Sequence, residues 1–275
     1  MRVVILCGSN PNQKALANKI AKQFDVVGLV IEKRVGKNKK QSFSKILKKI
    51  WDRTRFHKID GVWKKMMRHY EEFYSQFPNT SETLVTPNVN DKSVYDFVGN
   101  CDPDLVVVSG TRIIKPPFFD LKPSKGITNL HTGISPYIKG GPNCTNWCLA
   151  EDQFHLIGNT IMWIDAGIDS GNIITTEQTS ITGEENLFEL HIKVMEHAHD
   201  LYLRSLHTIE YQFDDCPSVP QKDIDKGNLY YNRMWTASKK RSLLNNTKGS
   251  RFKQRVQSNE YKENTKALHL ISLPN

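Results

Sequence analysis

The property that most limits the possible folds of this chain of 275 residues is a series of short apolar runs separated by segments with helical spacing. The clearest runs are residues 3–6, 26–31, 104–110 and 127–130. Runs that are apolar at successive positions are typical of parallel strands covered on both faces. Between the first two runs, apolar residues recur at helical spacing, namely Ala15, Leu16, Ile20, Ala21 and Phe24. Strands alternating with helices predict an α/β protein with a doubly wound, mostly parallel, Rossmann-like sheet.

The alternation continues through the middle of the chain and stops after about residue 212. We expect further strands at 83–85, 159–164 and 173–178, and helices at 93–98, 143–150 and 187–209. Residues 213–220 look like a linker, 229–231 fit a strand, and a polar, basic tail follows. We therefore predict a main domain over residues 1–212, with a helical, basic insertion at 33–77, and a short C-terminal extension at 213–275.

Positive charge is concentrated in the insertion and in a second run at 239–255. The chain carries 38 Lys and Arg against 29 Asp and Glu, a net charge of +9. Within the insertion, two apolar stripes lie at 43–51 and 63–74, and because the aromatic residues fall on these stripes, core packing is favoured over stacking on nucleic-acid bases. Solvated helix faces are the first explanation for the charge. Attraction of an anionic nucleotide or phosphate is the alternative.

Other features bound the cellular setting and the cofactors. No stretch approaches the roughly 20 apolar residues that cross a bilayer, and the first eight residues become polar too soon for a signal peptide, so we expect a cytoplasmic protein that contacts no membrane. Five scattered cysteines argue against a disulfide framework. Cys144 and Cys148 lie four apart without companion histidines, which predicts thiols on one helix face and no metal site.

Three polar residues carry the chemistry that we expect. Asn129 and His131 stand at the end of an apolar run, and Asp169 follows 38 positions after His131 (169 − 131). In a doubly wound sheet, ligands bind beyond the carboxyl ends of the strands. A carboxamide, an imidazole and a carboxylate can polarise a carbonyl, stabilise the oxyanion formed when an amine attacks it, and remove the proton of the amine. The three residues therefore predict acyl transfer without a covalent enzyme intermediate.

The segments around these residues resemble the enzymes that transfer a formyl group from 10-formyltetrahydrofolate. The family pattern runs N-x-H-x-S-x-x-P-x-Y-x-G, then G-x-T, then D-x-G. This chain has, in order, Asn129-Leu130-His131, Ser135-Pro136-Tyr137, Gly140-Gly141, Gly158-Asn159-Thr160 and Asp169-Ser170-Gly171. In this alignment the turn between Ser135 and the proline is one residue shorter than in the family. Residues 1–212 would be the catalytic domain, and the resemblance is strongest to the sugar N-formyltransferases.

The resemblance implies a role for each catalytic candidate, with 10-formyltetrahydrofolate as the formyl donor and no metal. Asn129 would donate a hydrogen bond to the formyl oxygen, and His131 would stabilise that oxygen as negative charge develops. Asp169 would orient His131, raise its affinity for a proton and help to deprotonate the amine. Asp165 is the rival carboxylate, and it ranks second because Asp169 matches the D-x-G position.

The resemblance also implies binding residues. Two segments would hold the folate through backbone groups: Gly110, Thr111, Arg112 and Ile113, and Ile164, Asp165, Ala166, Gly167 and Ile168. Ser9 and Asn10, in the first strand-to-helix turn, would contact a phosphate of the acceptor, although Pro11 suits simple capping equally well. The other expected acceptor-binding residues are Ser135, Tyr137, Gly140 and Gly141.

Four acceptors are compatible with the resemblance: a nucleotide-linked amino sugar, initiator methionyl-tRNA, glycinamide ribonucleotide and a hydroxyornithine-type precursor. The tRNA enzyme has a full C-terminal barrel, whereas only about 65 residues follow residue 210 here (275 − 210). The purine enzyme lacks a basic insertion. A nucleotide-linked amino sugar fits best, and its diphosphate suits the positive charge.

The expected partner is therefore a small, anionic amine, without a nucleic-acid partner, and a homodimer is left open. A non-catalytic folate-binding protein and a nucleic-acid-binding protein are the alternatives from other classes. The intact Asn129, His131 and Asp169 argue against the first. The second would show binding that falls steeply with salt and survives His131→Ala.

Overall fold

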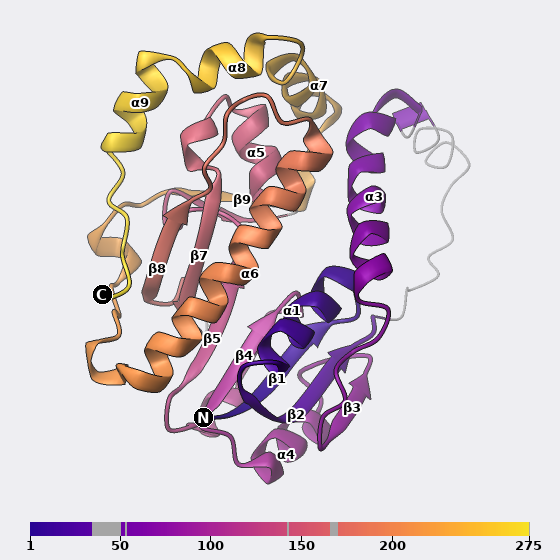
Figure 1. The fold of residues 1–275 in the computed structure, drawn as a ribbon, viewed down its shortest axis with the longest axis vertical. Coiled ribbons are helices and arrows are strands. Elements are labelled where there is room, and N and C mark those ends of the chain that lie inside the picture. Colours follow the sequence, from indigo (N-terminus) through magenta and orange to yellow (C-terminus); the bar gives the residue numbers. More distant parts are fainter. Residues whose placement is uncertain (35–50, 53, 142, 166–169, 275) are drawn as a thin grey trace.

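The computed structural model describes residues 1–34, 51–52, 54–141, 143–165 and 170–274. Its centre is a seven-stranded sheet in the order β3-β2-β1-β4-β5-β7-β8 (Figure 1). The strands are β1 Arg2–Gly8, β2 Asp25–Glu32, β3 Thr83–Thr86, β4 Leu105–Ser109, β5 Ile127–His131, β7 Gly158–Trp163 and β8 Ile173–Gln178. All neighbours from β3 to β5 are parallel, whereas β7 is antiparallel to both β5 and β8. The predicted mostly parallel α/β sheet is confirmed, with an antiparallel pair at one edge.

Helices cover both faces of the sheet. On one face lie α1 Pro11–Ala21 and the long α6 Leu187–Tyr211, which crosses the sheet diagonally in Figure 1, and α4 Lys92–Cys101 packs on the other. Strand side chains alternate between the faces. Val3 and Ile5 of β1 therefore join the α1/α6 core, while Val4 and Leu6 join the α4 core. This double covering explains why β1 is apolar at every position from Val3 to Cys7.

The basic insertion contains the helix α3 His57–Phe73, which packs against α1 and α6. The stripe predicted at 43–51 lies almost wholly outside the described residues, and its last member, Trp51, is exposed. On α3 the buried residues are Ile59, Val62, Met66 and Tyr70. The expected burial of Trp63 and Phe73 is wrong, since these side chains are 41% and 70% exposed. Trp63 lies one position, or about 100°, around the helix from Val62, which is enough to leave the apolar stripe.

The region after residue 212 is more ordered than the predicted polar tail. It contains the short strand β9 Asn228–Tyr230 and three helices, α7 Ala237–Asn246, α8 Arg251–Val256 and α9 Asn259–Lys266. These helices arch over α5 Cys144–Ala150 and the edge of the sheet (Figure 1). Short helical segments η1 to η5 lie at Phe118–Asp120, Phe154–Leu156, Phe213–Asp215, Gln221–Asp223 and Asn232–Met234. Leu243, Phe252 and Val256 anchor α7 and α8 in a core shared with α5.

Two contacts tie this C-terminal region to the main domain. Strand β9 pairs in parallel with β6 Ile138–Gly140, and Ile271 exchanges hydrogen bonds with Thr176 at the exposed edge of β8. None of the described helices is long and apolar enough to cross a membrane.

Candidate active site

The two catalytic candidates of β5 lie on the same face of the sheet. Side chains two apart on a strand point the same way, so Asn129 and His131 share one face. Thr128 and Leu130 point toward α6 on the other face, where the Thr128 hydroxyl lies 2.9 Å from the Tyr202 hydroxyl. Because Tyr202 also bonds to the backbone of β4, this buried contact fixes β5 relative to its neighbour.

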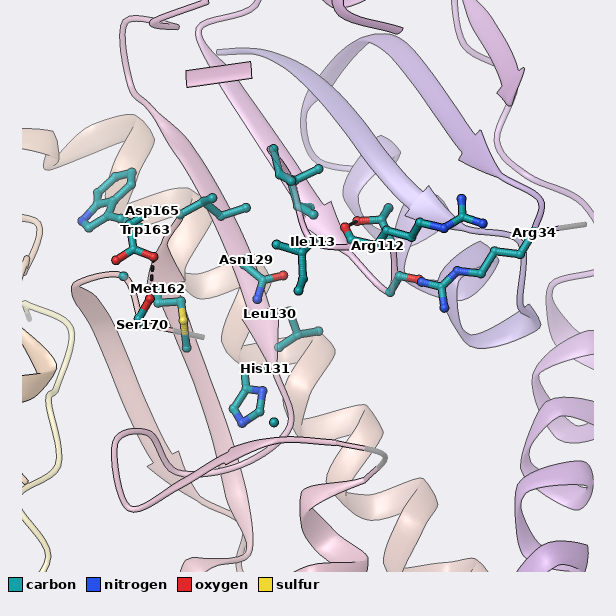
Figure 2. A pocket seen from close by; sticks show the side chains of 17 residues that line it. Arg34, Arg112, Ile113, Asn129, Leu130, His131, Met162, Trp163, Asp165 and Ser170 are labelled. Carbon is teal, nitrogen blue, oxygen red and sulfur yellow. Dashed lines mark hydrogen bonds between the residues drawn. The ribbon is translucent and has the colours of Figure 1, made fainter. Parts of the chain in front are cut away.

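Asn129 and His131 face a pocket of about 380 Å³ (Figure 2). The β4–η1 loop forms one wall, and residues 162–165 and 170–171 form the other. The pocket is lined by Arg34, Val108, Gly110, Thr111, Arg112, Ile113, Ile114, Asn129, Leu130, His131, Gly140, Met162, Trp163, Ile164, Asp165, Ser170 and Gly171. The antiparallel course of β7 produces this arrangement, because it brings residues 163–165 back alongside β5. A pocket of this size, apolar in part and with a few converging polar groups, suits a small ligand.

The orientation of the His131 ring is set by a backbone carbonyl. Its Nε2 lies 3.2 Å from the carbonyl oxygen of Ile138, and the side chain is buried. A carbonyl only accepts hydrogen bonds, so Nε2 carries the hydrogen in this contact. The Cys144 thiol donates to the Gly140 carbonyl at 3.5 Å, and its sulfur lies 3.5 Å from His131 Nε2. These contacts hold the imidazole in one tautomer.

The C-terminal extension supports the loop that holds His131. Gly140 has a φ of +90°, and a Cβ there would run into the Tyr230 carbonyl of β9. That carbonyl accepts the Gly141 N–H at 3.0 Å, and the Trp147 indole donates to the Gly141 carbonyl at 3.2 Å. Trp147 in turn stacks on Tyr230 with ring centroids 4.3 Å apart. Residues 138–141 are thus held between the main domain and β9.

The carboxamide of Asn129 points into the pocket in Figure 2, and no side chain among the described residues hydrogen-bonds to it. Asp165 lies on the pocket wall and accepts a hydrogen bond from the Ser170 hydroxyl at 2.7 Å. Asp169, the carboxylate predicted to act with His131, lies outside the described residues, as do Ala166, Gly167 and Ile168. The amide, the imidazole and the rival carboxylate thus line the same pocket.

A basic edge of the pocket is organised by Glu32, which ends β2 and whose side chain is completely buried. Glu32 accepts hydrogen bonds from Arg34 Nε at 3.0 Å, from Arg112 Nη1 at 2.7 Å, and from the backbone N–H groups of Val89 and Arg112. Burial tends to raise the pKa of Glu32, but these hydrogen bonds and the Arg34 charge outweigh burial and hold the pKa below its ordinary value. The carboxylate therefore stays charged and fixes both arginines.

Arg34 and Arg112 lie at the opposite end of the pocket from Asp165 and Ser170 (Figure 2). The pocket is thus basic at one end and carries a carboxylate at the other, with the amide and imidazole between them. The sequence reading missed Glu32 and Arg34. Their only signal was the charged triplet Glu32-Lys33-Arg34 directly after an apolar strand.

The other predicted site residues divide into two groups. Gly110, Thr111, Arg112, Ile113, Ile164 and Gly140 line the pocket. Ser9, Asn10, Ser135, Tyr137 and Gly141 are not among its lining residues. The first turn is nevertheless close, since a Cβ on Gly8 would lie 2.7 Å from the Gly110 carbonyl. Ser135 is fully buried, and the Tyr137 hydroxyl accepts the His269 N–H at 2.8 Å.

The interpretation of a shortened turn is wrong on counting. Asn129 and Pro136 are seven positions apart (136 − 129), as in the family pattern, so Gly133 rather than Ser135 stands where the pattern has serine. A glycine stands at position 133 because a larger residue has no space there. A Cβ on Gly133 would lie 2.8 Å from His131 Nε2 and 2.9 Å from the Cys144 Cβ. His131 and Cys144 therefore leave no room for a side chain at position 133.

The described residues hold no group of three His, Cys, Asp or Glu side chains placed as metal ligands. The described lining of the pocket presents an amide, an imidazole, the Asp165 carboxylate and two arginines.

Comparison with known proteins identifies the family. The formyl transferase family matches residues 1–206, and the chain belongs to this family. A methionyl-tRNA formyltransferase from Syntrophus aciditrophicus is 32% identical over 140 residues, which cover 51% of this chain and 44% of that protein. The chain thus matches less than half the length of this relative.

Solved structures show the same fold at low sequence identity. A 4-N formyltransferase from Francisella tularensis has a TM-score of 0.54 and 18% identity, covering 88% of this chain and 86% of that one. An N-formyltransferase from Helicobacter canadensis, solved with folinic acid and dTDP-3-aminofucose, has a TM-score of 0.52 and 15% identity, covering 89% and 80%.

Proposed function

We propose that this protein transfers a formyl group from 10-formyltetrahydrofolate to a primary amine. The observation that carries the proposal is the pair Asn129 and His131 on one face of β5, aimed at a pocket whose other walls lie in the segments nominated for the folate. The family match over residues 1–206 supports it. The pocket also fits a folate chemically, with apolar side chains such as Val108, Ile113 and Met162 beside arginines that suit its carboxylates.

The residues divide the work as follows. The folate supplies a formyl group whose carbon the amine attacks. Asn129 donates a hydrogen bond to the formyl oxygen, and His131, protonated at Nδ1, stabilises the negative charge that develops there. Asp169 accepts the proton that the attacking amine must lose, directly or through water. The C–N bond to the folate then breaks, and the folate nitrogen leaves with the proton that Asp169 took up, returned directly or through water. Donors fixed before the reaction cost no reorganisation at the moment of charge development.

For the acceptor, we propose a nucleotide-linked amino sugar. The Helicobacter canadensis neighbour was solved with dTDP-3-aminofucose, and a match that covers most of both chains supports a similar overall layout. The net charge of +9 and the pocket arginines suit a diphosphate. Methionyl-tRNA is the second candidate, because the relative with 32% identity bears that name. Glycinamide ribonucleotide and hydroxyornithine remain further alternatives.

We also propose that residues 1–212 form the catalytic domain and residues 213–275 an extension that completes it. Pairing of β9 with β6, next to the loop that contacts His131, supports this division of labour. A cytoplasmic location and a homodimer stay predictions.

The test is to mix the purified protein with 10-formyltetrahydrofolate and a panel of amino-sugar nucleotides, glycinamide ribonucleotide, hydroxyornithine and charged initiator tRNA. Tetrahydrofolate release and product mass are measured. We expect a gain of about 28 Da, the mass of CO, on an amino-sugar nucleotide, and loss of this product in the Asn129→Ala and His131→Ala variants. Turnover with tRNA alone would overturn the proposed acceptor, and absence of folate binding would overturn the formyl transfer.

A further inference from the structure

A second hollow, of about 610 Å³, takes no part in the mechanism above. It is bounded by the start of α3, the start of α5 and the side chain that follows η5. The residues that matter here are His57, Trp63, Lys64, Asn143, Asn146 and Trp235. They come from the basic insertion, the main domain and the C-terminal extension, so the hollow exists only because these three parts meet.

Two indole rings line the hollow. Trp63 is 41% exposed, and no other described aromatic ring packs against it. Trp235 is held in place, because it packs edge-on against the buried Trp147 with ring centroids 4.9 Å apart. An exposed indole costs solubility and adds little to the core. One fixed ring and one available ring suit a flat heterocycle.

The polar groups of the hollow are fixed hydrogen-bond donors. The Asn143 carboxamide oxygen accepts the Asn146 backbone N–H at 2.9 Å, and the Asn146 carboxamide oxygen accepts the His191 Nε2–H at 3.0 Å. Burial lowers the pKa of His191 to about 4, so this ring is neutral and keeps a defined tautomer. Since both carboxamide oxygens are engaged, the NH₂ groups remain as donors, and neither has a partner among the described residues. Such donors match ring carbonyl groups.

One residue that lines the hollow adjoins the active site in sequence. Asn143 directly precedes Cys144, whose sulfur lies 3.5 Å from His131 Nε2. The charge of the side chains that line the hollow suits an anion. Lys64 lines the hollow, and the one carboxylate among its described lining residues, Asp60, lies 3.3 Å from the Lys240 ammonium, which offsets the charge of Asp60. A flat ring in the hollow would therefore contact Trp63 and Trp235, with Lys64 available to its phosphates.

We propose that this hollow binds the base of a nucleoside diphosphate, with a ring carbonyl turned to Asn143 and Asn146, when the acceptor is bound. The inference rests on the proposed formyl transfer and adds to it the residues that select the nucleotide. It assigns to Trp63, in the basic insertion, a binding role that explains its exposure.

The test is calorimetric binding of UDP, dTDP, GDP and ADP to the full chain and to two variants of α3. Trp63→Ala removes the available ring, whereas Phe73→Ala removes a more exposed aromatic at the far end of the same helix. Loss of one stacked base raises Kd by about 5- to 150-fold on the usual scale of base–aromatic stacking. We expect that rise in Trp63→Ala for a nucleotide with ring carbonyls, recovery in Trp63→Phe, and no change in Phe73→Ala.

Two results would overturn the inference. One is a Kd that is the same in the wild type and Trp63→Ala, and the other is no binding of any of the four nucleotides to the wild type. Binding of 10-formyltetrahydrofolate is measured in the same samples, because it depends on the first pocket alone. If Trp63→Ala binds folate, transfers the formyl group and binds nucleotide as the wild type does, only the inference is contradicted. If the wild type does not bind folate, the proposed function is contradicted.

Discussion

Replacing Glu32 by Gln is the most informative perturbation of the basic end of the pocket. Glu32 is completely buried and accepts four hydrogen bonds, two from backbone N–H groups and two from guanidinium groups. Gln has nearly the same shape but offers one acceptor oxygen and places an NH₂ group against donors. The substitution therefore removes the charge and about half of the acceptor capacity without creating a cavity.

The size of the effect depends on the burial of Glu32 and on the partial exposure of the two arginines that pair with it. Removing one partner of a buried ion pair costs about 3–5 kcal/mol. Arg34 and Arg112 are 53% and 40% exposed, so they regain water when the carboxylate is lost. We therefore expect the free energy of unfolding to fall by about 2–3 kcal/mol, which corresponds to two lost charge-assisted hydrogen bonds that are partly replaced by water.

The assay is urea unfolding at pH 7 followed by circular dichroism, with Glu71→Gln as the matched control. Glu71 pairs with Lys14 at 2.8 Å but is 47% exposed, so its loss should cost about 0–1 kcal/mol. Because the folded-state pKa of Glu32 is lowered, its contribution is present above the ordinary value of 4.5 and is lost as pH falls through the lowered pKa. The difference between the wild type and Glu32→Gln should therefore shrink in acid. Equal effects of the two substitutions at pH 7 would refute this reasoning.

Three further predictions concern catalysis, the loop and pH. His131→Ala should lower the rate of formyl transfer by about 10²–10⁴-fold while the Kd for folate stays within a few-fold, and a loss of folate binding instead would mean that the ring serves structure. Gly140→Ala should lower the free energy of unfolding by about 1–3 kcal/mol, because φ is +90° and the new Cβ meets the Tyr230 carbonyl; an unchanged Tm would contradict this. Burial lowers the pKa of His191 in the folded protein to about 4 from the ordinary value of 6.5. Between these pH values only the unfolded chain protonates His191, so the free energy of unfolding falls with decreasing pH by up to about 1.4 kcal/mol per pH unit. His191→Gln, which can still donate to Asn146, should flatten this acid limb in denaturation curves, and an unchanged slope would assign the acid loss to other groups.

The sheet could be predicted because its signals are local. Apolar runs bounded by polar turns mark β1, β2, β4 and β5, and alternation along β5 places Asn129 and His131 on one face. The antiparallel turn of β7 could not be predicted, because hydrophobic pattern does not encode strand direction.

The parts of the site that escaped prediction depend on long-range packing. Glu32 and Arg112 are 80 positions apart in the chain. They meet because β2 and β4 lie on either side of β1 in the sheet. The sequence predicted Cys144 only as one of two thiols on a helix face. Its contact with His131 depends on the path of the whole loop from β5 to α5, which the sequence pattern does not reveal. Trp63 was misplaced because a broad aromatic pattern does not reveal which 100° of a helix is covered.

The measurement that tests the central claim most directly follows an isotope-labelled formyl group in a single turnover. The Cys144 sulfur lies 3.5 Å from His131, which makes a thiol nucleophile the natural rival to direct attack by the amine. Wild-type protein is mixed with labelled 10-formyltetrahydrofolate, with and without the best acceptor, and the masses of protein and acceptor are recorded. Direct transfer predicts label on the acceptor amine, none on the protein, and turnover that survives Cys144→Ser. Label on Cys144, or an inactive Cys144→Ser variant that still binds folate, would contradict the account.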